Sequence, residues 1–468
     1  MTDICFLSIA EASYLIAQGE LSPVELVKAH LKRIDDIETH LNSFITILDE
    51  DALSSAHAAE VDIRSGKRIG DLHGIPIGVK DLCNTKNVRT TIGSKIMSDF
   101  VPTEDATVVK RLKSAGAIII GKLQMHEFAI GVTSENPHYG PAHNPWSTDR
   151  ITGGSSGGSA SSVASGQCMG AIGTDTGGSV RLPAALCGIV GLKPTFGRVS
   201  KNGVFPVAWN LDTVGPMTRT VRDAALMLNT ISGHDQRDQF SSHRPTEDWT
   251  TSINQDIQGI RIGVHRDYFF DRLGIDVESS ITAAADVLEG LGASITEVSI
   301  PLMDLASSIS TTIIGPEAVE IHMQDLLERP EDFDPSVRVR LEAGAVVSAH
   351  QYIKAQRART LFNRNVRTAM ETVDVILSPT SAVGAPKIGR EMVPVEGEFE
   401  TKLTLLSKLT RPFNLPGVPT ISLPCGFTSD GLPIGLQLSG RPFEEATILR
   451  VAHSYEQATE WHKRRPPI

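Results

Sequence analysis

The first 70 residues of the chain alternate apolar and polar positions at the spacing of amphipathic helices. Between residues 8 and 64 apolar residues recur every three or four positions. Examples are Val24, Val27, Leu31 and Ile34. A helix start signal precedes them, since Ser22 can cap a helix whose first residue is Pro23. We therefore predict an N-terminal helical layer over residues 1–70.

From residue 71 the pattern changes to short β-branched runs that alternate with helical stretches. The expected strands are IPIGV (75–79), AIIIG (117–121), GIRIGV (259–264), ASITEVSI (293–300), VDVILSP (373–379) and TISLP (420–424). Residues 302–370 are mostly helical, with a polar break at ERPEDFDPS. Such alternation is typical of a sheet that carries helices on its faces, so we predict an α/β fold.

Composition and charge narrow the class of protein. A chain of 468 residues with 40% hydrophobic residues can bury a large core. Its net charge of -11 comes from dispersed charges without a basic stripe, so we expect a small-molecule substrate and no nucleic acid. No apolar run approaches the ~20 residues of a membrane span, and the N-terminus lacks the features of a signal peptide. We expect no membrane association.

The cysteines indicate which cellular compartment the protein occupies. They are odd in number, widely spaced and free of CxxC motifs: Cys5, Cys83, Cys168, Cys187 and Cys425. Neither a disulfide framework nor a thiolate metal site is indicated. We therefore predict a reduced, cytoplasmic protein.

Three motifs suggest chemistry that their context does not support. GAIIIGK (116–122) has the spacing of a phosphate-binding loop, but an apolar strand fills it and Leu123 replaces the required Ser or Thr. GGSSG (153–157) matches a nucleophile elbow, yet a polar, turn-like segment precedes it in place of a buried strand. His126, His138 and His143 lack the helical pairing of a metal site. We predict no metal.

Three other stretches carry a consistent set of catalytic groups: GIPIGVKD (74–81), ITGGSSGGSASS (151–162) and GTDTGGSVRLPAALCGIVGLKPT (173–195). They contain glycine-flanked serines and Lys80 at the end of an apolar strand, without a convincing histidine or carboxylate base. Burial would favour the neutral form of Lys80, which could then accept a proton. The alternative is a structural Lys80 paired with Asp81. In DTGGS the two glycines can turn backbone N–H groups toward a developing oxyanion.

These stretches resemble the signature of the amidase signature family, nearly continuously from about residue 70 to 222. The resemblance implies that Ser179 is the nucleophile, that Ser155 is a bridging serine held by a cis peptide bond, and that Lys80 is the base. It places the oxyanion donors at Thr176, Gly177 and Gly178. Asp175, Arg181 and Ser156 would brace the site.

The same resemblance implies the architecture. We expect one domain with a large mixed β-sheet that helices cover on both faces. Within it, 71–222 would form the catalytic core, 223–370 a variable substrate-shaping region, and 371–468 a return to the core sheet. The last segment contains a weaker echo of the family's closing motif, starting at FNLPGVPTISLP.

Three functions remain open. The one we favour from the sequence is a stand-alone hydrolase of a small amide, urea or carbamate, without cofactor and with a homodimer left open. The second is the glutaminase subunit of a tRNA-dependent amidotransferase. In such subunits a Tyr, an Arg and an Asp bind glutamine; here Ser407 aligns with the Asp, and SSISTT (307–312) lies where the Tyr should fall. A substrate with two charged ends would therefore lack partners. The third is an inactive binding homologue.

Overall fold

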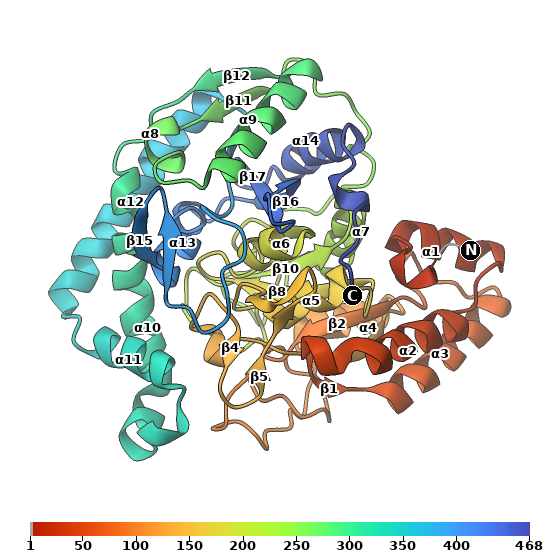
Figure 1. Cartoon of the computed structure of the whole chain (residues 1–468). Helices are drawn as coiled ribbons and strands as arrows, with labels where there is room; N and C mark the ends of the chain where they lie inside the picture. The colour runs from red at the N-terminus through yellow and green to blue at the C-terminus, as the bar shows by residue number, and fades with distance from the viewer. Residues whose placement is uncertain (1–2) are drawn as a thin grey trace.

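One large mixed sheet organises the chain. The computed structural model describes residues 3–468 and contains within them an eleven-stranded sheet (Figure 1). Its strands follow in the order β1 (Phe44–Ile47), β3 (Ile118–Leu123), β2 (Pro76–Lys80), β8 (Gly170–Asp175), β10 (Thr213–Thr218), β9 (Val190–Lys193), β16 (Thr420–Phe427), β17 (Pro433–Gly440), β13 (Val375–Pro379), β11 (Arg261–Val264) and β12 (Ser294–Glu297). Strands β3, β2 and β8 are parallel, as are β13, β11 and β12, whereas the pairs between these groups are antiparallel.

Three two-stranded sheets lie outside the large one. They pair β4 (Glu135–Asn136) with β5 (Gly140–Pro141), β6 (His143–Asn144) with β7 (Ser147–Ile151), and β14 (Met392–Val395) with β15 (Glu398–Thr401).

The α-helices surround the sheet. They are α1 (Ile9–Gln18), α2 (Pro23–Leu41), α3 (Asp49–Arg64), α4 (Thr107–Ser114), α5 (Gly157–Ala164), α6 (Arg181–Cys187), α7 (Val221–Ile231), α8 (Arg266–Phe269), α9 (Ile275–Gly290), α10 (Ala306–Glu328), α11 (Pro335–Ala345), α12 (Ala349–Thr372), α13 (Lys402–Ser407) and α14 (Glu445–Gln457). In Figure 1 the N-terminal helices α1–α3 lie at one side of the molecule and α10–α12 at the opposite side. No helix among residues 3–468 is long and apolar enough to cross a membrane.

Helices cover both faces of the sheet, as predicted. Successive residues of a strand point to opposite faces of the sheet, so Gly170 and Gly173 of β8 face opposite sides and have different neighbours. A Cβ at Gly170 would lie 2.6 Å from Met227 of α7, whereas one at Gly173 would lie 3.0 Å from Ser156, next to α5. Helices α5 and α6 pack together, and α7 packs against α14, which gives a separate layer on each side. The fully buried strands β2 and β8 lie between these layers.

The N-terminal region contains one element that the periodicity did not predict. Ser22 caps α2 by accepting hydrogen bonds from the N–H groups of Val24 and Glu25, and Pro23 is the first helical residue, as expected. However, Phe44–Ile47 forms strand β1, which pairs antiparallel with β3 at the edge of the large sheet. A run of only four residues is too short to interrupt the helical pattern around it, although its aromatic and β-branched residues favour a strand.

The first turn of α5 is packed against the sheet too closely for any side chain. Gly158 donates its N–H to the carbonyl of Gln124 over 2.9 Å. A Cβ at Gly158 would lie 2.4 Å from the carbonyl oxygen of Ser43 and 2.5 Å from that of Gln124. Both neighbours are backbone atoms of the sheet and its connections, so they have little freedom to move.

We therefore expect Gly158→Ala to destabilise the protein by about 1–3 kcal/mol, the usual cost of overpacking a core. Thermal unfolding followed by circular dichroism measures this effect. Gly290→Ala is the matched control, since Gly290 is also helical but has no atom within 4 Å of its Cβ position. Equal melting temperatures for the two variants would contradict this account of α5.

Candidate active site

Lys80, the last residue of β2, is fully buried. Its Nζ donates hydrogen bonds to the hydroxyl of Ser155 over 2.8 Å and to that of Thr174 over 2.9 Å. Burial disfavours the charged amine and lowers the pKa of Lys80 to about 7. The amine is therefore close to neutrality at physiological pH and is hydrogen-bonded to a hydroxyl.

The neighbouring carboxylate of Asp81 is occupied elsewhere. It lies 3.2 Å from Nζ of Lys122 and accepts hydrogen bonds from the N–H and hydroxyl of Thr91. Lys122 also donates to the carbonyl of Cys83. The structural alternative considered from the sequence, in which Asp81 pairs with Lys80, is thus not what the chain adopts.

Ser155 follows a cis peptide bond from Gly154, the one cis bond of the described chain. The carbonyl of Ser155 accepts a hydrogen bond from the N–H of His126 over 3.1 Å. Next to it, the Ser156 hydroxyl contacts the backbone N–H and carbonyl of Thr174, each over 3.3 Å. Ser156 and Lys80 therefore both contact Thr174, near the end of β8.

Ser179 lies in the turn that leads from β8 into α6. The carboxylate of Asp175 shapes this turn by accepting hydrogen bonds from the N–H groups of Gly178 over 2.8 Å and Val180 over 3.2 Å. Gly178 has a φ of 128°, and a Cβ there would lie 2.2 Å from the Thr410 hydroxyl, so the position requires glycine. Gly177 and Ser179 are partly exposed and line a cavity.

The predicted oxyanion donors are not equivalent. The N–H of Gly178 is used by Asp175. Among residues 3–468, the N–H groups of Thr176 and Gly177 have no hydrogen-bond partner. No hydrogen bond joins the hydroxyls of Ser155 and Ser179 within this part of the chain either. The catalytic roles of these residues stay predictions.

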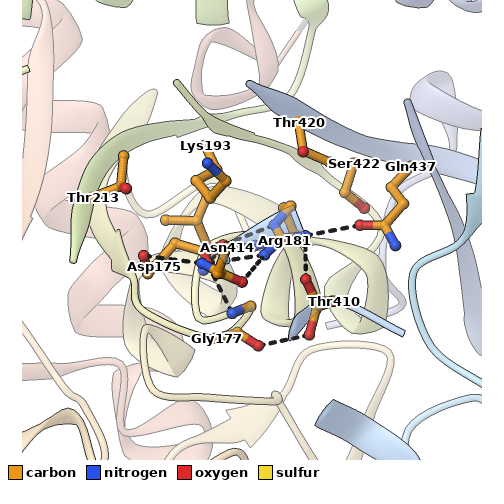
Figure 2. Close-up of polar contacts among 12 residues, drawn as sticks. Asp175, Gly177, Arg181, Lys193, Thr213, Thr410, Asn414, Thr420, Ser422 and Gln437 are labelled. Atoms are coloured by element: carbon orange, nitrogen blue, oxygen red, sulfur yellow. Dashed lines mark hydrogen bonds and ion pairs between the residues drawn. The ribbon is translucent and has the colours of Figure 1, made fainter. Parts of the chain in front are cut away.

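A buried cation holds the turn in place. Figure 2 shows the guanidinium of Arg181 among Asp175, Thr410, Asn414 and Gln437. It is 3.0 Å from the Asp175 carboxylate and donates to Asn414 over 2.7 Å and to Gln437 over 3.0 Å. Burial alone would raise the pKa of Asp175, but the charge and hydrogen bonds of Arg181 outweigh it and hold that pKa below its usual range.

This network also fixes the turn between β8 and α6 from the C-terminal part of the chain. The carbonyl of Thr410 accepts a hydrogen bond from Arg181 over 3.0 Å, and the Thr410 hydroxyl donates to the carbonyl of Gly177 over 2.7 Å. A segment more than 200 residues away in sequence thereby fixes the Gly177 peptide.

The cavity at Ser179 has a volume of about 170 Å³. Two of its lining residues come from the positions that the sequence singled out for glutamine binding, namely Ser407 and, within SSISTT, Thr311. Arg340 of α11 and Arg411 of a short 3₁₀ helix (Arg411–Phe413) also line it. We expected both charged ends of an amino-acid substrate to lack partners, whereas the two guanidinium groups offer partners to a carboxylate. Sequence reasoning missed Arg411, which lies outside the quoted motifs, and gave no role to Thr174, although Thr174 lies within the stretch 173–195.

The three histidines have separate surroundings. His126 accepts a hydrogen bond from the N–H of Ser134, and burial lowers its pKa to about 3. His138 contacts Glu127, and His143 contacts the carbonyl of Thr148. The described residues contain no group of three His, Cys, Asp or Glu side chains that could hold a metal ion.

The chain is similar to known proteins over its full length. The Amidase family model matches residues 25–449. A glutamyl-tRNA(Gln) amidotransferase subunit of Chloroflexus aggregans is 43% identical, and the match covers 100% of this chain and 99% of the relative. The structure of the corresponding subunit from Thermotoga maritima has a TM-score of 0.82 at 33% identity, over 98% of this chain and 96% of that one.

A second solved structure fits the fold still better. It comes from a vestigial protein complex described as revealing the evolutionary origins of an s-triazine catabolic enzyme. Its TM-score is 0.93 at 34% identity, and the match covers 96% of this chain and 98% of that chain.

These relatives correct our prediction of partners. The dispersed charge led us to expect a small-molecule substrate and no nucleic acid, and a homodimer was left open. Relatives matching the whole chain are named as subunits of an enzyme for glutamyl-tRNA(Gln), which contradicts that expectation. The net charge of a single chain does not describe contacts that other chains of an assembly make, so it was the wrong quantity to use.

The amidase prediction itself is confirmed. The mixed sheet with helices on both faces, the family match and the solved structures agree. The chain therefore belongs to the amidase signature family, whose enzymes hydrolyse the C–N bonds of amides.

Proposed function

We propose that Lys80, Ser155 and Ser179 form a proton relay that turns Ser179 into a nucleophile. The observation that carries this proposal is the 2.8 Å hydrogen bond from a fully buried lysine amine to the Ser155 hydroxyl. A neutral Lys80 takes the proton of Ser155 while Ser155 takes the proton of Ser179. The Ser179 oxygen then attacks the amide carbon and forms a tetrahedral intermediate.

The remaining steps use the same groups in reverse. The N–H groups of Thr176 and Gly177 stabilise the negative oxygen, since no other acceptor occupies them within residues 3–468. The relay returns the proton through Ser155 to the amide nitrogen, the C–N bond breaks, and ammonia or an amine leaves. Water attacks the acyl-Ser179 ester, gives its proton to the relay, and releases a carboxylate.

We further propose that the chain is the amide-hydrolysing component of an amidotransferase complex that acts on glutamyl-tRNA(Gln). The 43% identity to a subunit of such an enzyme over the whole chain supports this function. The cavity contributes a second argument, since Arg340 and Arg411 offer guanidinium groups to the carboxylate of an amide donor. Ammonia released at Ser179 would serve the complex.

The complex is tested by supplying labelled glutamyl-tRNA(Gln), the companion subunits of the Chloroflexus aggregans enzyme, and an excess of an amide donor that carries a carboxylate, with glutamine in one reaction and glutaramate in a parallel one. Amidated tRNA should form when this chain replaces its Chloroflexus relative, and should disappear with Ser179→Ala. Amide hydrolysis by the chain without any tRNA amidation in the reconstituted complex would contradict the amidotransferase function and leave the relay standing.

The two serines should respond differently to substitution. Ser179→Ala should abolish acyl-enzyme formation, whereas Ser155→Ala should retain a trace, because the attacking oxygen survives. Intact-mass spectrometry after exposure to a reactive ester measures the adduct. Ser156→Ala is the control and should still be acylated, since the Ser156 hydroxyl contacts only the backbone of Thr174. A stable adduct on Ser155 in the Ser179→Ala protein would reverse the assignment.

The rate should depend on pH through Lys80. Only the neutral amine starts the relay, so kcat/KM should rise with pH along a limb whose midpoint lies near the Lys80 pKa of about 7. Lys80→Arg should lose activity because a guanidinium stays protonated. Lys201→Met, which removes a partly buried lysine whose pKa is also lowered, should keep the limb. A near-native pH profile in Lys80→Arg would show that the base lies elsewhere.

A further inference from the structure

The cavity that contains Ser179 has an unbalanced positive charge. Arg340 and Arg411 are its only charged lining residues, and all of its lining residues lie in the described part of the chain. Most of the remaining wall is apolar, with Leu182, Ile314 and Leu341 among its larger side chains. A ligand of this cavity therefore meets two cations and a hydrophobic surface.

Each guanidinium is fixed by the protein through a neutral acceptor. Nη1 of Arg340 donates to the carbonyl of Ile130 over 2.7 Å, and Nη1 of Arg411 donates to the Thr311 hydroxyl over 2.7 Å. Neither forms an ion pair with any acidic side chain of residues 3–468 within salt-bridge distance. Since a guanidinium has five N–H donors, both keep donors for a ligand.

The two cations also act on each other. Burial lowers the pKa of Arg411 to about 10, and the charge of Arg340 contributes to the shift while Tyr268 opposes it. The carboxylates of Asp334 and Glu391 also act on Arg340, from a neighbouring cavity that Arg340 lines as well and that does not contain Ser179. Two partly buried cations in one cavity are costly without a counter-ion, so a bound anion would be stabilised there.

Arg411 lies next to the reacting centre. A Cβ placed on Gly177 would be 3.5 Å from Cγ and 3.7 Å from Nε of Arg411. A ligand whose amide is bound at Ser179 can therefore place a carboxylate on the guanidinium groups only if a short spacer joins its amide to its carboxylate. The apolar wall favours an aliphatic spacer.

A substrate ammonium group would meet no carboxylate in the same cavity, because no lining residue is acidic. The Ser407 hydroxyl donates to the carbonyl of Leu403 over 2.7 Å and offers an ammonium group only a neutral oxygen. An ammonium group there would be repelled by both guanidinium groups. Building on the amide hydrolysis proposed above, we propose that the site selects amides that carry a carboxylate and no ammonium group, namely monoamides of short dicarboxylic acids.

Three amides of the same length test the proposal. Glutaramate has a carboxylate only, glutamine adds an ammonium group, and pentanamide has neither charge. Their affinities for the Ser179→Ala protein are measured by calorimetry, which requires no turnover. Glutaramate should bind about tenfold or more tightly than either of the others. Pentanamide leaves the two guanidinium groups unpaired, and the ammonium group of glutamine is repelled by them.

A charge introduced at Ser407 should change this preference. Ser407→Asp supplies the missing carboxylate and should raise the glutamine-to-glutaramate affinity ratio about tenfold or more. Ser407→Asn is the matched neutral control and should leave the ratio near that of the parent. Circular dichroism of both variants verifies that they fold, and the parent protein tests the proposal by itself if either does not.

Binding of glutamine as tight as that of glutaramate, or equal binding of pentanamide, would overturn the proposal. Hydrolysis by the native chain separates this outcome from the function proposed above. If glutaramate binds preferentially but no amide is cleaved and no reactive ester acylates Ser179, the anion selectivity stands and the hydrolytic function fails.

Discussion

The burial of one amine determines how this site can work. Nζ of Lys80 lies inside the protein at the end of β2 and contacts two hydroxyl groups, those of Ser155 and Thr174, without a carboxylate beside it. A charged amine is poorly solvated in such a place, which lowers its pKa to about 7. The adjacent Asp81 would cancel this effect if it paired with Lys80, and its pairing with Lys122 prevents that.

A second buried basic residue, Arg181, has a structural role. It is paired with Asp175 and fully hydrogen-bonded, so it stays charged and stabilises the turn without exchanging protons. Through Thr410 and Asn414 it joins the Ser179 turn to the C-terminal part of the chain. The family's closing segment thus matters to the site although it supplies no member of the proposed relay. Of these two buried basic residues, Lys80 has no paired carboxylate and is the base of the proposed relay, whereas Arg181 is paired with Asp175 and makes the turn rigid.

The sequence predicted what depends on local pattern. The strand ending at Lys80, the turn at Ser179 and the layers around the sheet follow from periodicity and from motifs in which glycine is required by close packing. It did not predict β1, whose four residues are too few for a pattern. Arg340 and Arg411 also escaped, because both are far from Ser179 in sequence, lie on separate elements and reach its cavity only through the fold. The error about partners had a different origin, since charge averaged over one chain does not describe a complex.

The titration of Lys80 tests the central claim most directly. NMR of protein with ¹³C-labelled lysine Cε, recorded across a pH series, reports the neutral fraction of each lysine amine, buried amines included. The account predicts a Lys80 resonance that titrates near pH 7 and is absent from Lys80→Met. A Lys80 amine that stays charged up to about pH 10, as an exposed lysine does, would contradict it.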